Sequence, residues 1–239
     1  MYDTVVLKLL KEDIGDKYDW RSVFNKIDQT SEYKQVEGGS GHINGLRVSV
    51  TEKHVRVTGS LSKYFRGTNL DSLTLSQVEK AIKQLGKELG VPMIEADVER
   101  VDMAENFEMS RPPEFYISKM QSLGECCPNK WKGTTYFPSN GVLLRFYDKS
   151  KEVRKKRKNQ KNTPGAFSTS VEQNLLRYEI CFGKKAIRRM FGHQLKAKDL
   201  YDKDIFWRLV SEWLYSYDEI GIISDKLFDV SFEQIKTLS

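Results

Sequence analysis

The sequence predicts an α+β fold in which a central antiparallel β-sheet is packed with helices. Short runs of alternating apolar and polar residues follow one another closely, which is typical of strands joined by hairpins. Two other segments have apolar residues at spacings of three and four, as amphipathic helices do. With 239 residues, of which 39% are hydrophobic, the chain can bury a well-packed core. No apolar run approaches the ~20 residues that span a bilayer.

The first half of the chain is predicted to form strands around one long helix. We expect a strand over residues 4–10, a short helix over 20–27, and a flexible turn at the glycine-rich residues 38–41. Residues 46–50 and 54–58 alternate around a polar turn and predict a hairpin. The clearest helix covers residues 74–89, because Thr74 and Gln77 can form a capping box and Gly90 supplies a stop.

The second half continues the same pattern. We expect strands over residues 94–103, 134–137, 142–149 and 175–182, with a Ser139-Asn140-Gly141 turn before the third and a break at 163–165. Pro112-Pro113 opens a short helix, and a last helix covers 204–219. Residues 1–220 are predicted to be one domain and residues 221–239 a tail or the start of a further segment.

The charge is concentrated in one segment. The chain has 39 Lys and Arg residues against 33 Asp and Glu, a net charge of +6. Residues 149–161 hold eight of the basic residues and one acid, so the rest of the chain has a net charge of −1. Such a run cannot be buried, because each charge would lose its hydration. It is therefore either a solvated surface loop or a contact that follows the phosphates of a nucleic acid.

Cysteine and histidine usage argues against a disulfide framework and a zinc site. Cys126 and Cys127 are adjacent and Cys181 lies in an apolar run, which favours reduced thiols in a cytoplasmic protein. The three histidines lack metal-ligand spacing. The N-terminus has no basic head or apolar core of a signal peptide, which again predicts a cytoplasmic location and no membrane partner.

Three of the predicted strands have one polar face each, because successive side chains of a strand point to opposite faces. The residues that share these faces are, strand by strand, Arg100 and Asp102; Arg145, Tyr147 and Lys149; and Arg177 and Glu179. A solvated sheet face also alternates, but it favours Thr, Ser, Lys and Glu in loose order. If the three strands lie in one sheet, the polar faces gather carboxylates, arginines, a lysine and a tyrosine.

These groups suit phosphodiester chemistry. Two carboxylates can hold Mg²⁺ or Mn²⁺, which prefer oxygen ligands and polarise a phosphate. The guanidinium group of an arginine can donate two parallel hydrogen bonds to the oxygens of one phosphate. A tyrosine hydroxyl becomes a nucleophile when a nearby cation or metal stabilises its ionised form.

The sequence resembles the gene II/X family of phage and plasmid replication initiators, which are rolling-circle nicking enzymes distantly related to the HUH endonucleases. The resemblance covers roughly residues 46–220. The motifs that carry it are Gly59-Ser60-Leu61-Ser62-Lys63-Tyr64, Gly67-Thr68-Asn69, Leu73-Thr74, Val98-Glu99-Arg100-Val101-Asp102, Asn106-Phe107, Phe146-Tyr147-Asp148-Lys149, Glu152, Leu176-Arg177-Tyr178-Glu179-Ile180, Leu200-Tyr201-Asp202, Trp213 and Tyr217.

The resemblance implies an HUH-endonuclease-like fold and a nicking mechanism. A tyrosine would attack a phosphodiester at a replication origin, leaving a 5′-phosphotyrosyl link and a free 3′-OH that primes synthesis. The reverse reaction would rejoin the circle. The implied partners are origin DNA, single-stranded or as a hairpin or supercoiled duplex, and a host helicase and polymerase in the cytoplasm of a bacterium.

The motif positions imply a role for each residue of the polar faces. Tyr147 would be the nucleophile and Lys149 would stabilise its phenolate or the departing oxygen. Asp102 and Glu179 would hold Mg²⁺ or Mn²⁺. The DNA contacts would come from Arg100, Arg145, Arg177, Arg154, Lys155, Lys156, Arg157, Lys158, Lys63 and Arg66.

The chain departs from the family pattern at the metal site, because it has no His-hydrophobic-His triplet. The Arg100-Val101-Asp102 strand stands in its place, and a third ligand could be Asn106, Asp97, a histidine or water.

Other tyrosines compete with Tyr147. Tyr217 lies on the apolar stripe of the last helix and Tyr178 on the apolar side of its strand, so both are expected to be structural. Tyr215 is off that stripe and could be exposed. Lys63, Tyr64 and Arg66 either contact single-stranded DNA or form an ordinary exposed turn.

The sequence thus predicts a metal-dependent, site-specific DNA nickase and ligase that initiates rolling-circle replication. A non-catalytic origin-binding initiator is the second interpretation. A related transposase or mobilisation nuclease is the third.

Overall fold

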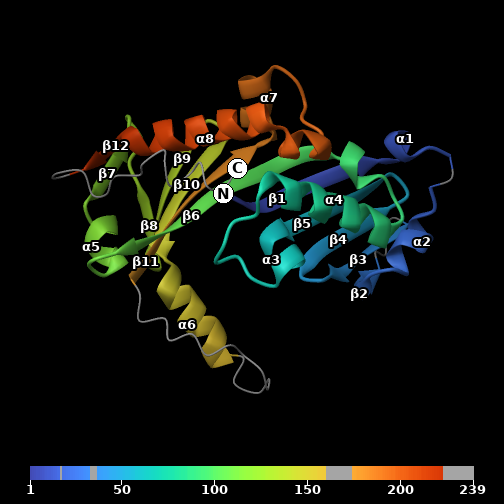
Figure 1. Cartoon of the computed structure of the whole chain (residues 1–239), viewed down its shortest axis with the longest axis horizontal. Coiled ribbons are helices and arrows are strands. Elements are labelled where there is room, and N and C mark those ends of the chain that lie inside the picture. Colours follow the sequence, from blue (N-terminus) through green and yellow to red (C-terminus); the bar gives the residue numbers. More distant parts are fainter. Residues whose placement is uncertain (17, 33–36, 160–173, 223–239) are drawn as a thin grey trace. The chain divides into compact units, whose positions relative to one another are not determined.

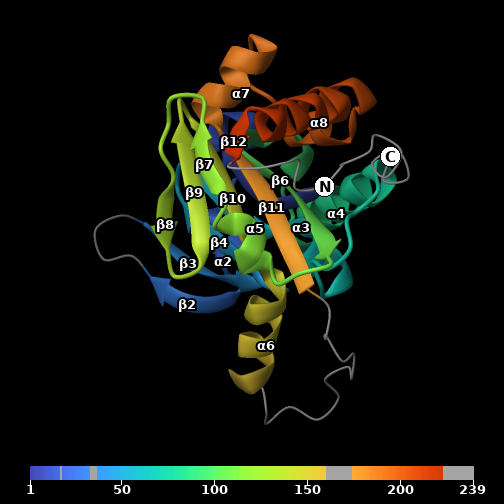
Figure 2. The same ribbon diagram turned by 90° about the vertical axis from the view of Figure 1, so that its left-hand side faces the viewer.

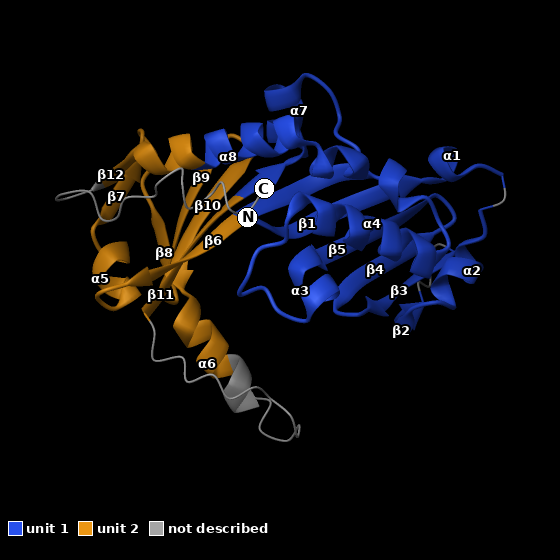
Figure 3. Cartoon of the chain, in the orientation of Figure 1, with its two compact units in different colours: residues 1–103, 181–213, 231–239 blue, residues 104–180, 214–230 orange. Residues whose placement is uncertain are grey.

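The computed structural model describes residues 1–222 except 17, 33–36 and 160–173, and it describes no side chains from 156 to 159. The predicted break at 163–165 lies outside the described residues, as do residues 223–239 of the predicted tail at 221–239. The chain divides into two compact units (Figure 3). The described part of unit 1 is residues 1–16, 18–32, 37–103 and 181–213, and that of unit 2 is residues 104–159, 174–180 and 214–222.

The strands form a large antiparallel sheet, so the predicted α+β class is confirmed. Ten strands follow one another in the order β2-β3-β4-β5-β1-β6-β11-β10-β9-β8, and β12 and β7 form a separate pair. The HUH-like character of the fold stays a prediction. Among the described residues, no helix is long and apolar enough to cross a membrane.

Unit 1 contains the N-terminal strands and the helices next to them (Figure 1). Its elements are β1 (Tyr2–Leu10), α1 (Lys11–Ile14), α2 (Trp20–Phe24), β2 (Asp28–Glu32), β3 (Gly38–Ile43), β4 (Leu46–Thr51), β5 (His54–Ser60), α3 (Leu61–Arg66), α4 (Leu75–Leu89), η1 (Met93–Glu95), the first part of β6 (Asp97–Met109), the end of β11 (Asn174–Gly183), α7 (Lys184–Phe191), η2 (Ala197–Tyr201) and most of α8 (Lys203–Asp218).

The hairpin and the helix ends that the sequence predicts are present in unit 1. The predicted hairpin is β4 and β5, in antiparallel register from Arg47↔Thr58 to Val50↔Val55. Helix α4 begins with a capping box in which the Thr74 hydroxyl accepts from the Gln77 amide and the Gln77 side chain accepts from the Thr74 amide. It ends at Gly90, whose left-handed φ of 71° suits glycine.

The prediction of a flexible turn at residues 38–41 is wrong. These residues begin β3 and are buried, and β3 pairs with β4 from Gly38↔Thr51 to Ile43↔Leu46. A Cβ atom on Gly39 would lie 2.5 Å from the ring of Phe24, and one on Gly41 would lie 2.4 Å from the carbonyl oxygen of Asp28. The glycines therefore allow close packing against this strand, which the sequence alone does not reveal.

Unit 2 contains the second half of the sheet and its hairpins (Figure 2). Its elements are the end of β6, α5 (Pro113–Ile117), β7 (Met120–Leu123), β8 (Asn129–Trp131), β9 (Thr134–Ser139), β10 (Val142–Asp148), α6 (Lys149–Asn159), most of β11, the last turn of α8 and β12 (Ile220–Ile222). The predicted turn joins β9 and β10 at Asn140 and Gly141, both of which have positive φ, whereas Ser139 still belongs to β9.

The described part of the basic segment, residues 149–159, is a helix rather than a loop or the end of a strand. Strand β10 ends at Asp148, whose carboxylate accepts a hydrogen bond from the Lys151 amide at 2.9 Å and so caps the first turn of α6. The Ser150 hydroxyl also accepts from the amide of Leu175 on β11, at 2.8 Å. These two bonds fix where the helix begins. The prediction that Lys149 ends the strand is therefore wrong.

Candidate active site

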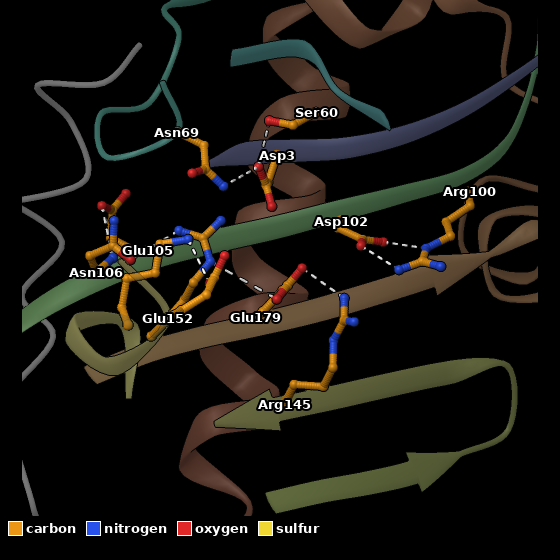
Figure 4. A network of polar contacts seen from close by, with 12 residues as sticks. Asp3, Ser60, Asn69, Arg100, Asp102, Glu105, Asn106, Arg145, Glu152 and Glu179 are labelled. Carbon is orange, nitrogen blue, oxygen red and sulfur yellow. Dashed lines mark hydrogen bonds and ion pairs between the residues drawn. The ribbon is translucent and has the colours of Figure 1, made fainter. Parts of the chain in front are cut away.

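The polar face of β10 and β11 has the predicted composition in unit 2. On β10, Leu144 and Phe146 are buried, whereas Arg145 and Tyr147 lie on the opposite face and are half-buried. An Arg145 Nη2–H group donates to Glu179 Oε1 on the neighbouring strand β11, at 2.7 Å (Figure 4). The predicted assembly of polar groups from separate strands is therefore present between these two.

The end of β6, which belongs to unit 2, adds the side-chain amide of Asn106 to this group of polar residues. Arg177 is 2% exposed, and its Nη1–H group donates to Asn106 Oδ1 at 3.0 Å. The Nε atom of Arg177 is 3.9 Å from Glu179 Oε2. The Glu179 carboxylate is thus flanked by two guanidinium groups, and the amide oxygen of Asn106 accepts from one of them.

Lys149 lies beside Tyr147, although it belongs to the helix and not to the strand. Its Nζ atom is 6.0 Å from the centre of the Tyr147 ring, and it donates to Glu152 Oε2 at 2.9 Å. The side chain of Lys149 is almost fully buried, so this ammonium group has little water around it. A cation in such surroundings acts on a neighbouring charge more strongly than a solvated one.

In unit 1, Arg100 and Asp102 share a face of β6, as predicted. Asp102 is 0% exposed, and both of its oxygens accept from Arg100, from Nε at 2.7 Å and from Nη2 at 2.6 Å (Figure 4). This two-pronged pair is the strong geometry for a guanidinium and a carboxylate. It leaves the Asp102 carboxylate already engaged by a cation.

The carboxylates do not fit a divalent cation as they are paired in the described structure. Asp102 is held by Arg100, and Glu179 is held by Arg145. A metal ion would have to displace these guanidinium groups. The residues that the structure describes contain no group of three or more His, Cys, Asp and Glu side chains that could hold a metal. Of the suggested third ligands, Asp97 is paired with Lys196 at 3.0 Å, and Asn106 accepts from Arg177. The metal ligands stay a prediction.

The rival tyrosines lie in different surroundings. Tyr178 is fully buried and its ring stacks on Phe146, with the ring centres 4.6 Å apart. The ring of Tyr217 lies 6.0 Å from that of Tyr178. Tyr215 is exposed on α8. The expected structural character of Tyr178 is therefore confirmed. Tyr147 lies on the face that carries Arg145, as does Tyr136, which lies opposite Arg145 on β9.

In the segment around Lys63, the two basic side chains are exposed but the tyrosine is not, so the DNA contacts of Lys63 and Arg66 stay predictions. Tyr64 is 7% exposed, and its hydroxyl donates to Glu88 at 2.7 Å. Arg66 donates to Gln77 and to the carbonyl oxygen of Ser72. The ring of Tyr64 is therefore not available to stack on a base.

Some polar residues with clear contacts were missed by the sequence reasoning. Asp3, on β1 in unit 1, is buried and accepts from Ser60 Oγ at 2.8 Å and from Asn69 Nδ2 at 3.2 Å. Ser60 also caps α3 by accepting from the Lys63 amide. Part of the Gly59–Asn69 motif thus holds unit 1 together. The sequence did hold a clue to this contact, because Asp3 is the single acidic residue of an otherwise largely apolar strand.

On helix α6, Lys151 and Arg154 project largely into solvent. Lys151 forms an ion pair with Glu114, and Arg154 lies 3.9 Å from the carboxylate of Asp148. Lys155 is exposed, and the side chains of the other predicted DNA contacts, Lys156, Arg157 and Lys158, lie outside the description.

Comparison with known proteins identifies the family. No curated protein matches the chain in sequence. Residues 1–213 match the Phage CRI family, described as the N-terminal region of a replication-associated protein, in agreement with the resemblance to phage rolling-circle replication initiators. Because the match covers most of the 239 residues, the chain belongs to this family of phage replication-associated proteins.

Proposed function

We propose that this protein nicks and rejoins DNA at a phage replication origin, with Tyr147 as the nucleophile. The observation that carries the proposal is the position of Tyr147. Its ring lies 6.0 Å from the ammonium nitrogen of Lys149 and on the strand face that also carries Arg145. Membership of a replication-associated family makes DNA the expected substrate.

The reaction would begin when Tyr147 gives its hydroxyl proton to solvent. The phenolate oxygen attacks the phosphorus, the bond from phosphorus to the 3′ oxygen breaks, and that oxygen takes up a proton. The products are a 5′-phosphotyrosyl link and a 3′-OH primer. Rejoining is the reverse, with the 3′-OH as the attacking group and the tyrosine as the leaving group.

The neighbouring cations support this chemistry. The Lys149 ammonium would stabilise the phenolate, because opposite charges within a few ångströms favour the ionised form. Arg145 and Arg177 would bind the non-bridging phosphate oxygens, where charge develops in the transition state. Arg145, Arg177 and Lys149 outnumber Glu179 and Glu152 by one positive charge, so this group of residues favours an anion.

The test is transfer of label from DNA to protein. Origin-bearing DNA labelled on the 3′ side of the nick is incubated with the protein, and SDS-resistant labelled protein is measured with Mg²⁺, with Mn²⁺ and with a chelator. Tyr147→Phe is expected to abolish the adduct but retain DNA binding. An adduct that persists in Tyr147→Phe and disappears in Tyr215→Phe or Tyr217→Phe would overturn the assignment. The chelator arm tests the predicted metal requirement.

One observation favours a second candidate, a non-catalytic origin-binding initiator. Both predicted metal-ligand carboxylates are engaged by arginines. In that case no DNA carrying the origin would yield an adduct, although the protein would still bind it. The host helicase and polymerase stay predicted partners.

A further inference from the structure

The strand register extends the face of Tyr147 across two more strands of unit 2. Tyr147 on β10 lies opposite Thr134 on β9, and Thr134 lies opposite Trp131 on β8. Residues directly opposite each other in antiparallel strands point to the same face. Trp131 therefore shares a face with Tyr147, two strands away, at a backbone separation of roughly 10 Å.

A second row on the same face contains another aromatic residue. Arg145 lies opposite Tyr136 on β9, and Tyr136 lies opposite Asn129 on β8. Tyr136 is thus a diagonal neighbour of both Tyr147 and Trp131, a relation that separates side-chain positions by about 7–8 Å. Tyr147, Tyr136 and Trp131 form a continuous aromatic row across three strands. We call it the aromatic track.

The far end of the track is open to solvent and bears a cation. Trp131 is 63% exposed and is one of four exposed large apolar side chains among the described residues, with Leu70, Phe115 and Tyr215. The turn that follows places Lys132 and Gly133 at positive φ, 47° and 79°, as a tight hairpin turn requires. The Nζ atom of Lys132 lies 4.3 Å from the centre of the Trp131 ring. An exposed indole and an ammonium group are thus held together at the hairpin tip.

We propose that the aromatic track binds single-stranded DNA next to the scissile phosphate, with unpaired bases on Tyr136 and Trp131 and a phosphate on Lys132. This inference rests on the proposed role of Tyr147 and adds three residues that would hold the single strand, Tyr136, Trp131 and Lys132. Bases stack on exposed aromatic rings regardless of their sequence, and interleaved cations hold the backbone. Arg145, opposite Tyr136, supplies a second cation along the same path.

The chemistry of the track favours an unpaired strand over its alternatives. The faces of bases inside a duplex are covered by their neighbours, so an aromatic ring can stack only on bases that have left the helix. A second copy of this chain could instead pair with β8, which is an edge strand. The cation over the indole and the basic residues beside the track match a polyanion better.

The test measures binding in the Tyr147→Phe background, where no covalent adduct forms, so that it is independent of nicking. The probes are a labelled 20-mer of thymidylate and its duplex with the complementary adenylate strand, followed by fluorescence anisotropy. The variants are Trp131→Ala, Trp131→Phe and Lys132→Ala. Phe115→Ala is the matched control, because Phe115 is an exposed ring that also contacts cations, Arg111 and Lys119, but lies outside the aromatic track.

We expect Trp131→Ala to weaken binding of the single strand roughly 5- to 100-fold, with little change for the duplex. Trp131→Phe retains a ring and should restore most of the affinity. Lys132→Ala should lower the log–log salt slope by about 0.7. Equal losses on both probes, an equal loss in Phe115→Ala, or unchanged binding would overturn the proposal. A changed oligomeric state in Trp131→Ala with unchanged binding would assign the hairpin tip to a protein interface instead.

Discussion

The α3 segment and the junction of β10 and α6 both combine basic and aromatic residues, but the tyrosines in them have opposite surroundings. In unit 1, Tyr64 on α3 is buried and donates its hydroxyl to Glu88, while Arg66 donates to Gln77 and a carbonyl oxygen. In unit 2, Tyr147 lies beside the Lys149 ammonium at the junction of β10 and α6. The compositions are alike, but one tyrosine has an acid as its neighbour and the other a cation.

The comparison shows that the neighbouring charge, more than the residue type, decides what a tyrosine can do. Burial and the hydrogen bond to Glu88 raise the pKa of Tyr64 above its ordinary value. This tyrosine is therefore held in its protonated form, which is a poor nucleophile. A cation next to the ring acts in the opposite direction on the phenolate.

The largest expected effect is on the rate of adduct formation, and it should differ between an arginine of β10 and an arginine of α3. Arg145→Ala should slow adduct formation by about 10²–10³-fold, the usual cost of removing one donor to a developing oxyanion. Arg66→Ala, the matched control from α3, should leave the rate at saturating DNA within about twofold, because Arg66 hydrogen bonds within unit 1, to Gln77 and the carbonyl oxygen of Ser72, and such surface substitutions have small effects. Pre-steady-state adduct formation measures both. Equal rates for the two variants would contradict a phosphate-binding role for Arg145.

A smaller effect is expected on DNA affinity and its salt dependence when the basic residues of helix α6 are replaced. Replacing Arg154, Lys155 and Arg157 with Gln should weaken binding to all DNA sequences and lower the log–log salt slope by about 2 units. The control is the same change at Lys80, Lys83 and Lys87, which are exposed on α4 in unit 1. Titrations at several salt concentrations measure the slope. If the α4 variant loses as much slope as the α6 variant, net charge alone explains the binding.

The smallest effect is a pH dependence of stability from Tyr64. Its folded-state pKa is raised above the ordinary value near 10, so the folded protein keeps a proton that the unfolded chain loses. This contribution to stability is full below pH ~10 and is lost as the pH rises further. Tyr64→Phe should flatten the alkaline decline in the free energy of unfolding. Urea titrations between pH 8 and pH 11 test this, and parallel curves for the two proteins would contradict it.

The parts of the fold that local chemistry dictates could be predicted from the sequence. The capping box at Thr74, the stop at Gly90 and the β4–β5 hairpin depend on residues a few positions apart. The strand formed by the glycine-rich segment could not, because its glycines pack against Phe24 and Asp28 on other elements. Helix α6 was missed because Asp148, its cap, also completes the alternating pattern of β10. Helix α7 was not expected at all.

The site was predictable in its composition but not in its pairing. Strand alternation placed Arg145 with Tyr147 and Arg177 with Glu179, since each face is a local property. Which carboxylate would meet which arginine depends on strand order and register. The Arg145–Glu179 bond and the role of Asn106 as an acceptor for Arg177 therefore emerged only in the structure. The same holds for the row from Tyr147 to Trp131, which joins residues on three strands.

The most direct test of the central claim is to locate the nucleotide on the protein. Trypsin cleaves after Arg145 and Lys149, so Tyr147 is the single tyrosine of a four-residue peptide, whereas Tyr215 and Tyr217 fall together in a peptide of residues 209–226. After nicking, nuclease digestion and trypsin, mass spectrometry reports which peptide carries the nucleotide. We expect the modification on the peptide that contains Tyr147. A nucleotide on residues 209–226 would contradict the account.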